Sequence, residues 1–351
     1  MLTTSHLFPF ATALLLALVF TPLVRHLALG WHIVDQPGGR KIHQKPVPLL
    51  GGLAIFLALA LSAALLAMAG NLQTDAASLV RFGSIGLGAI MIMVGGFLDD
   101  RYRLKPAQQF IFPLTAALVV LLGGIRIQFV TNPLGGVLEF STAVGVILAF
   151  FWLLGMMYTT KLLDGLDGLV AGITTIAGLI IFIVSLYWDA PDSSTSSLAL
   201  ILAGAALGFL VFNWHPASIF LGEGGSIFCG FMIGVLAIVS GSKIATALLM
   251  MGIPILDVLW VIVRRLWQGN SPVKADRKHL HFRLLDIGLS HRQAVLVLLL
   301  LTGSFGVTAL FLHTRGKIVA LVVLAGIMVV LATTLVAVYQ RQKKTKNNFE
   351  L

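Results

Sequence analysis

The 351-residue chain contains a single cysteine, and only 11% of its residues are charged. One cysteine, Cys229, excludes an internal disulfide and a cysteine-ligated zinc site, and its place inside an apolar run predicts a packing role. The low charge and the 58% hydrophobic content exclude a water-soluble globule, whose apolar content is about 45 to 50%. The first 24 residues hold no Lys or Arg, so the basic start of a cleavable signal peptide is missing. The composition predicts an integral membrane protein that retains its first apolar segment.

Long apolar runs make up most of the chain. A helix needs about 20 apolar residues to cross a bilayer, and the runs near this length predict an all-α polytopic fold with about eleven transmembrane helices. These lie at 5–29, 50–70, 78–98, 106–122, 142–158, 168–188, 197–213, 226–240, 244–263, 294–313 and 317–339. Residues 1–339 form one membrane domain, and 340–351 are a basic tail. Between 123 and 141, two alternating runs flank Asn-Pro and Gly-Gly pairs, which predicts a small external β-hairpin.

The basic residues are divided unequally between the loops. With the N-terminus outside, nineteen of the 24 Lys and Arg residues face the cytoplasm, which leaves Arg81, Arg126, Lys243, Arg315 and Lys317 outside. Because cytoplasmic loops are enriched in Lys and Arg, the pattern predicts an external N-terminus and a cytoplasmic C-terminus. The net charge of +10 fits contact with lipid phosphates better than contact with nucleic acid.

Three acidic clusters lie at the predicted cytoplasmic ends of apolar runs: Asp99 with Asp100, Asp164 with Asp167 in KLLDGLDGLV, and Glu223 in FLGEGGS. Each has an ordinary explanation, as solvated helix ends, an acidic N-cap or a flexible turn. Aspartates are disfavoured at a helix C-terminus, however, and an N-cap explains only one of the second pair. A carboxylate within a membrane costs roughly 2.5 to 3.5 kcal/mol. Three clusters on one surface therefore favour a cation site, since hard oxygen ligands completed by substrate phosphates are how Mg²⁺ is usually held.

The last predicted cytoplasmic loop contains SPVKADRKHLHFRLLDIGLSHRQ. His279 and His281 are two residues apart and do not share a helical face, so zinc binding is weakly supported. The surrounding Lys and Arg residues predict a cationic patch that binds phosphate. An amphipathic helix over RLLDIGLSHRQ, lying on anionic lipid, is the alternative. Both can hold, because the two need the same charges.

Taken in this order, the motifs resemble the polyprenyl-phosphate N-acetylhexosamine-1-phosphate transferases, within glycosyltransferase family 4. The DQPGGRKIHQKPVPLLGG loop and the HxH element resemble the bacterial type that primes teichoic-acid, O-antigen and related polymers. The resemblance implies transfer of a sugar 1-phosphate from a UDP-sugar to polyprenyl (undecaprenyl) phosphate, with release of UMP. It also implies Mg²⁺, for which Mn²⁺ could substitute, and an active site on the cytoplasmic face of the inner membrane. The chain could pair as a homodimer.

The resemblance implies roles for individual residues. The catalytic set is Asp99, Asp100, Asp164, Asp167, His279 and His281. The metal ligands are Asp99, Asp100 and Glu223. The substrate-binding set is His43, Lys45, Lys161, Arg277, and Asn213 with Phe220 at the uracil.

Three positions depart from the family pattern. Lys161 stands where Asn is usual, Glu223 where Asp is usual, and Phe282 where a third His is usual. Lys161 and Glu223 could be a paired change that sets an amine against a carboxylate. Two other hypotheses stay open, a catalytically silent relative and an ion-coupled transporter. The second is disfavoured because transporter sites lie near the bilayer midplane between repeated halves, whereas these acids lie at helix ends and the chain shows no internal repeat.

The division of basic residues predicts the topology. A reporter domain fused after Gln342 should behave as cytoplasmic, and one inserted near Asn132 should behave as external, because Lys and Arg concentrate on the cytoplasmic side. Protease protection in intact cells measures both. Cytoplasmic behaviour at Asn132 would contradict the eleven-span topology and the grouping of the acids on one side.

Overall fold

The computed structural model describes residues 4–38, 45–70, 75–132, 134–188, 193–241, 243–269 and 279–349. Two predicted substrate-binding residues, His43 and Arg277, lie outside these ranges. The helices are α1 (Thr4–Gly30), α2 (Gly51–Met68), α3 (Ala76–Tyr102), α4 (Pro106–Leu122), α5 (Thr142–Leu163), α6 (Leu169–Trp188), α7 (Ser194–Asn213), α8 (Gly222–Val239), α9 (Ile244–Met250), α10 (Gly252–Trp267), α11 (Leu280–Asp286), α12 (His291–Phe311) and α13 (Thr314–Phe349). β1 (Val34–Asp35) pairs antiparallel with β2 (Val47–Pro48), and β3 (Phe129–Thr131) with β4 (Val137–Glu139).

The chain is a multi-pass helical membrane protein, as predicted. Within the described ranges, nine helices are long and apolar enough to cross a membrane. The bent pair α9 and α10 would make a tenth span, and α4 is a shorter apolar helix. The β3–β4 pair lies where the sequence predicts a hairpin. Its external position, the total of eleven spans and the orientation stay predictions.

The predicted span at 244–263 is not one straight helix. It is α9 and α10, which meet at Met251 and are bent by 74° relative to each other. Pro254 lies in the first turn of α10, where its missing N–H is tolerated. Hydropathy is continuous across the joint, so an apolar run could not reveal the break.

α8 is the most enclosed candidate span, with 89% of its apolar window buried, Cys229 included. Its first turn touches two other helices through glycine: Gly224 lies against Gly96 of α3, and Gly225 against Gly52 of α2. A Cβ on Gly96 or Gly52 would overlap the α8 backbone. Small residues at such interfaces let membrane helices approach closely. These contacts place the start of α8 beside the end of α3 and the start of α2.

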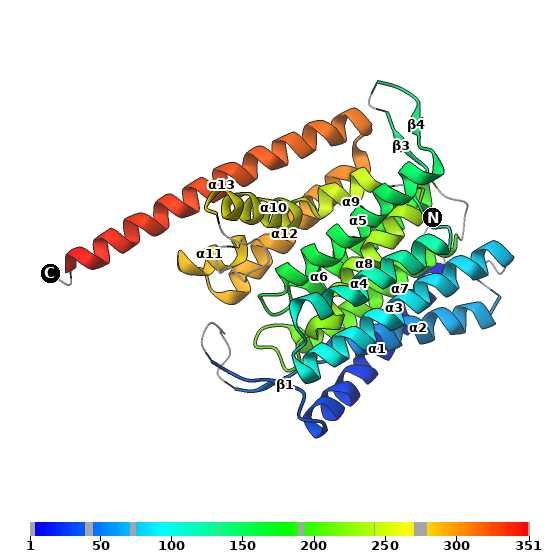
Figure 1. Ribbon diagram of the computed structural model, residues 1–351, viewed down its shortest axis with the longest axis horizontal. Helices are drawn as coiled ribbons and strands as arrows, with labels where there is room; N and C mark the ends of the chain where they lie inside the picture. The colour runs from blue at the N-terminus through cyan, green and yellow to red at the C-terminus, as the bar shows by residue number, and fades with distance from the viewer. Residues whose placement is uncertain are drawn as a thin grey trace.

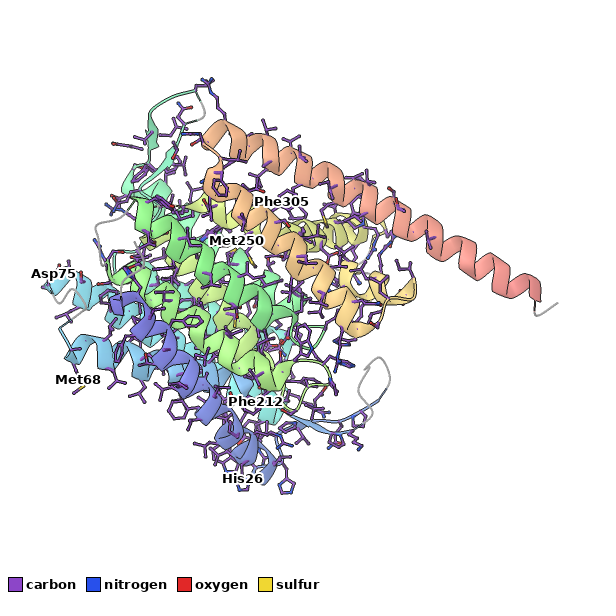
Figure 2. All side chains as sticks on the ribbon, turned by 180° about the vertical axis from the view of Figure 1, so that it is seen from behind. His26, Met68, Asp75, Phe212, Met250 and Phe305 are labelled. Carbon is purple, nitrogen blue, oxygen red and sulfur yellow. The ribbon has the colours of Figure 1, made fainter. Side chains whose placement is uncertain are left out.

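The connections divide between the two ends of the bundle. We call the end with β1–β2, the α3–α4 turn and α11 the pocket end, and the end with β3–β4 the hairpin end (Figure 1). Seen from behind, His26 and Phe212 lie toward the pocket end, and Met68 and Asp75 toward the other (Figure 2). α13 runs from the hairpin end past the pocket end (Figure 1). By chain order, the five basic residues predicted to be external belong to the hairpin end.

The glycine contacts of α8 predict a position-specific cost on α3. Gly96→Ala should lower the apparent Tm of the detergent-purified protein, because the new methyl group meets the Gly224 backbone. Overpacking of this kind costs about 1 to 3 kcal/mol. Gly86→Ala on the same helix is the control, since its Cβ would meet nothing within 4 Å. Equal Tm values for the two variants would contradict the close packing of α3 on α8.

Candidate functional site

A pocket of about 880 Å³ opens at the pocket end of the bundle. Its wall combines side chains from the ends of α3, α5 and α7, the starts of α6, α8 and α12, and the β1–β2 region. The carboxylates are Asp35, Asp99, Asp100, Asp164, Asp167 and Glu223. The basic side chains are Lys45 and Lys161, with His215 and His291. The three acidic clusters predicted to share one surface therefore line one pocket.

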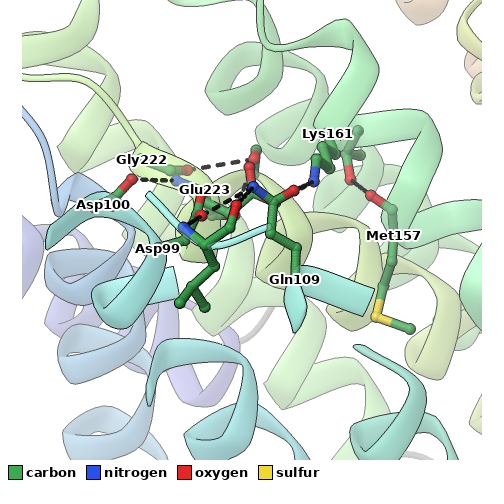
Figure 3. A network of polar contacts seen from close by, with 10 residues as sticks. Asp99, Asp100, Gln109, Met157, Lys161, Gly222 and Glu223 are labelled. Atoms are coloured by element: carbon green, nitrogen blue, oxygen red, sulfur yellow. Dashed lines mark hydrogen bonds and ion pairs between the residues drawn. The ribbon is translucent and has the colours of Figure 1, made fainter. Parts of the chain in front are cut away.

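A chain of polar contacts links the acids of α3 and α8 (Figure 3). Asp99 Oδ1 accepts hydrogen bonds from Leu104 N at 2.8 Å and Gln109 Nε2 at 2.9 Å. Gln109 Oε1 accepts from Lys161 Nζ at 3.0 Å, and Lys161 forms an ion pair with Glu223. The α3–α4 turn is short, so α4 folds back and brings Gln109 over Asp99. The ion pair confirms the hypothesis from the sequence that the Lys161 amine faces the Glu223 carboxylate.

Asp100 lies at the N-terminus of α8. Its Oδ1 accepts the Glu223 N–H at 3.1 Å, and its Oδ2 occupies the space that a side chain on Gly222 would need. Gly222 has φ +75°, a conformation that glycine adopts without strain. The unpaired N–H groups at a helix start stabilise a carboxylate. One Asp100 oxygen is thus held by the protein, and the other stands at the pocket wall.

Asp164 caps α5 and is exposed to the pocket, although protein surrounds the pocket on the other sides. That enclosure raises the pKa of its carboxyl to about 7, with Glu223 and Asp167 adding repulsion. Water in the open pocket counteracts part of this effect. A bound cation would relieve the repulsion between these carboxylates, since opposite charges nearby favour the ionised form.

Asp167 begins a second network. Its Oδ2 accepts from the Ala217 N–H at 3.1 Å and contacts His215 Nδ1 at 2.7 Å, and its own N–H donates to His291 Nε2 at 2.8 Å. Nearby, the buried Asn213 accepts from Gly168 N at 3.0 Å and donates to the Ile219 carbonyl at 2.9 Å. Asn213 thus ties the end of α7 to the start of α6, and its contact with uracil stays a prediction.

The two predicted catalytic histidines lie behind the described part of the pocket wall. His279 Nδ1 contacts Asp257 Oδ2 at 3.0 Å, and both side chains are buried. The His281 ring packs against Gly165 and against Phe282, which lines the pocket. Burial lowers the pKa of His281 to about 4, so this imidazole is neutral near pH 7. A role of these histidines near the diphosphate stays a prediction.

The alternative helix over RLLDIGLSHRQ is wrong as a single element. α11 ends at Asp286, Gly288 has φ +104°, and α12 starts after the Ser290 cap. Ser290 and Gln293 form a capping box, a start signal that the sequence displays. This break places His291 at the pocket.

Sequence reasoning therefore missed several residues of the site. His215 precedes a proline in the loop between Asn213 and Phe220, which is the signal that could have singled it out. His291 follows a capping residue, a weaker signal. Gln109 and Asp257 carried no local signal, because only their tertiary contacts distinguish them.

Comparison with known proteins identifies the class. A sequence profile of glycosyl transferase family 4 matches residues 82–241, which include most of the pocket acids. A probable undecaprenyl-phosphate N-acetylglucosaminyl 1-phosphate transferase of Bacillus subtilis is 35% identical over 87% of this chain and 84% of its own length. A decaprenyl-phosphate N-acetylglucosaminephosphotransferase of Mycolicibacterium smegmatis is 34% identical over 94% and 88%. A phospho-N-acetylmuramoyl-pentapeptide-transferase of Shouchella clausii is 29% identical over 86% and 94%.

The fold and the pocket define a multi-pass membrane protein with a carboxylate-rich site at one end of its helices. The chain belongs to glycosyl transferase family 4, and the family resemblance recognised in the sequence is confirmed.

The Lys161–Glu223 contact predicts energetic coupling. Lys161→Met should lower the Tm, because Glu223 is left mostly buried without its cation, and adding Glu223→Gln should recover part of the loss. Residues in contact couple by about 0.5 to 3 kcal/mol, and the partial exposure of this pair points to the lower part of that range. Thermal unfolding of the wild type, both single variants and the double variant measures the coupling. Strictly additive shifts would show that the two departures from the family pattern are independent.

Proposed function

We propose that the protein transfers a sugar 1-phosphate, of the N-acetylhexosamine class, from a UDP-sugar to polyprenyl phosphate. The products are a lipid diphosphate sugar, which primes a cell-envelope glycan, and UMP. The observation that carries the proposal is the gathering of three acidic clusters in one pocket at the end of membrane helices. There a membrane-held phosphate and a soluble nucleotide can meet. The names of the relatives support the same chemistry.

The reaction asks the protein for positioning more than for covalent chemistry. An oxygen of the polyprenyl phosphate attacks the β-phosphorus of the UDP-sugar, and the bond from that phosphorus to the oxygen bridging it to the α-phosphorus breaks, so that UMP leaves. Phosphoryl transfer of this kind is accelerated by alignment of the two groups and by offsetting negative charge. Lys45 and Lys161 face the pocket and can supply part of that positive charge.

The pocket carboxylates fit a hard divalent cation. Asp99, Asp100 and Glu223 supply oxygen atoms from two helices, which is the donor type that Mg²⁺ prefers. Asp100 keeps one oxygen at the pocket wall, and Glu223 shares its carboxylate with Lys161. When bound there, Mg²⁺, or Mn²⁺ in its place, would offset the charge of the diphosphate.

We place the reaction on the cytoplasmic face of the plasma membrane. The support is the excess of Lys and Arg in the loops of the pocket end, which the positive-inside rule assigns to the cytoplasm. A UDP-sugar reaching the pocket from the cytoplasm agrees with this orientation.

One further hypothesis has a specific observation behind it. The Lys161–Glu223 ion pair sets a positive charge on one proposed metal ligand, which would suit a relative that binds the substrates without turning them over. The two possibilities differ in a direct assay for product.

The test is incubation of the purified protein with a panel of UDP-sugars, polyprenyl phosphate and Mg²⁺. UMP and the lipid diphosphate sugar should appear together in equal amounts, and chelation of the metal should stop both. UDP-sugar binding without either product would contradict the proposed transfer and favour the silent relative.

Two acid variants should separate the site from the fold. Asp100→Asn and Asp164→Asn should each reduce turnover by about 100-fold or more, the usual cost of removing a charged group aimed at a reacting centre. Asp75→Asn is the matched control, because Asp75 caps the opposite end of α3 and Asn is an equally good cap. Near-native turnover in both acid variants would remove the pocket acids from the mechanism.

A further inference from the structure

One oxygen of the Asp167 carboxylate is bound within the protein. Its Oδ2 accepts the Ala217 N–H at 3.1 Å and lies 2.7 Å from His215 Nδ1. His215 and Ala217 belong to the loop that joins α7 to α8, while Asp167 stands directly before α6. The carboxylate therefore fixes the position of this loop and, through it, the position of the His215 ring.

A carboxylate on one nitrogen of an imidazole determines what the other nitrogen can do. With Nδ1–H donating to Asp167, the neutral ring presents Nε2 as a hydrogen-bond acceptor. His215 lines the pocket and its side chain is 34% exposed. No residue within the described ranges makes a hydrogen bond to Nε2. The loop thus offers an oriented acceptor to a ligand in the pocket.

His291 holds the same ring from its face. The two imidazoles stack with centroids 4.0 Å apart and planes 12° apart, and His291 Nε2 accepts the Asp167 N–H at 2.8 Å. Arg292 Nε donates to the His215 carbonyl at 2.9 Å, which fixes the backbone as well. The His215 ring is therefore restrained at its edge, its face and its main chain.

Asp167, His215 and His291 also offer ligand atoms within 4.8 Å of one another, a spacing that by itself would suit a metal ion. The ring geometry does not. An imidazole nitrogen binds a metal with the lone pair that lies in the plane of its ring, and two nearly parallel stacked rings do not direct these lone pairs at one point. The His291 lone pair is already used by the Asp167 N–H. The cluster is a hydrogen-bonding unit.

The position of the cluster in the pocket indicates which part of the donor it meets. The carboxylates that fit a cation come from the end of α3 and the start of α8, whereas Asp167 holds His215 at the start of α6. Asp164, which precedes Asp167 in the same loop, interacts electrostatically with both Glu223 and Asp167. A diphosphate held at the cation side leaves the nucleoside to extend toward His215. Phe220, an aromatic ring of the same loop, also lines the pocket.

We propose that His215 reads the base of the donor nucleotide, accepting the N3–H of uracil at Nε2, with Asp167 as its positioning residue. Uracil carries a hydrogen on N3, whereas the N3 of cytosine is an acceptor that would face the His215 lone pair. This inference rests on the proposed use of a UDP-sugar. It adds His215 to Asn213 and Phe220, the two residues that the family resemblance places at the uracil.

The experiment is calorimetric titration of UDP and CDP into the purified full-length protein. His215→Phe keeps a ring that can stack on His291 but removes both nitrogens. It should weaken UDP binding about 10-fold, the cost of losing one well-placed hydrogen bond, and leave CDP binding no weaker than in the wild type. Asp167→Ala should act alike. The double variant should be no weaker than the worse single variant, because both changes remove one interaction.

Steady-state kinetics add a second test, because a merely structural role of His215 would not change KM alone. His215→Phe should raise the KM for the UDP-sugar about 10-fold with kcat nearly unchanged, as expected when binding common to the ground state and the transition state is lost. His26→Gln, an exposed histidine of α1 at the same end of the bundle, should change neither binding nor kinetics.

Three results would overturn the inference. The first is losses that multiply in the double variant, since Asp167 would then touch the nucleotide by itself. The second is unchanged discrimination between UDP and CDP in His215→Phe. The third is a stoichiometric metal ion that His215→Phe abolishes. If the wild-type protein prefers UDP but forms no lipid product, the proposed reaction is contradicted and this inference is not. If the wild-type protein binds no UDP, both are contradicted.

Discussion

The close contact between the first turn of α8 and the last part of α3 is the constraint on which the site depends. Gly96 and Gly224 allow the two backbones to approach to a distance that no side chain permits. Because α3 ends there in Asp99 and Asp100, the approach brings the Asp100 carboxylate onto the Glu223 N–H. The same turn of α8 also packs on Gly52, which draws α2 and the β1–β2 region to the pocket. Packing inside the membrane thus sets the geometry of polar groups at its edge.

The second constraint is charge. Six carboxylates line one pocket, and two lysines are the cationic side chains among its lining residues. The protein meets part of this imbalance itself, since Lys161 pairs with Glu223 and reaches Asp99 through Gln109. Helix starts supply further N–H groups, as at Asp100. The negative charge that remains uncompensated is centred on Asp164, whose carboxyl has a raised pKa. The proposed cation, with the phosphates that accompany it, would offset this excess of negative charge.

The histidines near the pocket form two groups, one buried behind its wall and one lining it. His279 and His281 lie behind the wall, where Asp257 holds the first and burial keeps the second neutral. His281 packs against Gly165 and so supports the loop that carries Asp164 and Asp167. His215 and His291 instead stand at the wall and are tied to Asp167. Among the described residues, the imidazoles that line the pocket come from the α7–α8 loop and the start of α12.

Local patterns were sufficient for much of this protein. Apolar runs located the membrane helices, because crossing a bilayer requires length and hydrophobicity within one continuous segment. The acids at the helix ends, and their shared side, followed from the same runs and from the alternation of the chain between two ends. The motifs identified the family for the same reason, since their residue types and order are read directly along the chain.

Tertiary structure alone decided which of these groups touch. Asp167 meets His215 and His291, which are 48 and 124 residues away, and Asp257 meets His279 across a loop. The break at Met251 lies inside a uniformly apolar run, so hydropathy could not reveal it, although Gly252 and Pro254 stand beside it in the sequence. The sequence suggested Lys161 and Glu223 as partners, but they form an ion pair only because α5 packs against α8. Hydrophobicity is a property of each residue and can be read from the sequence, whereas a hydrogen bond between distant segments exists only once the helices have packed.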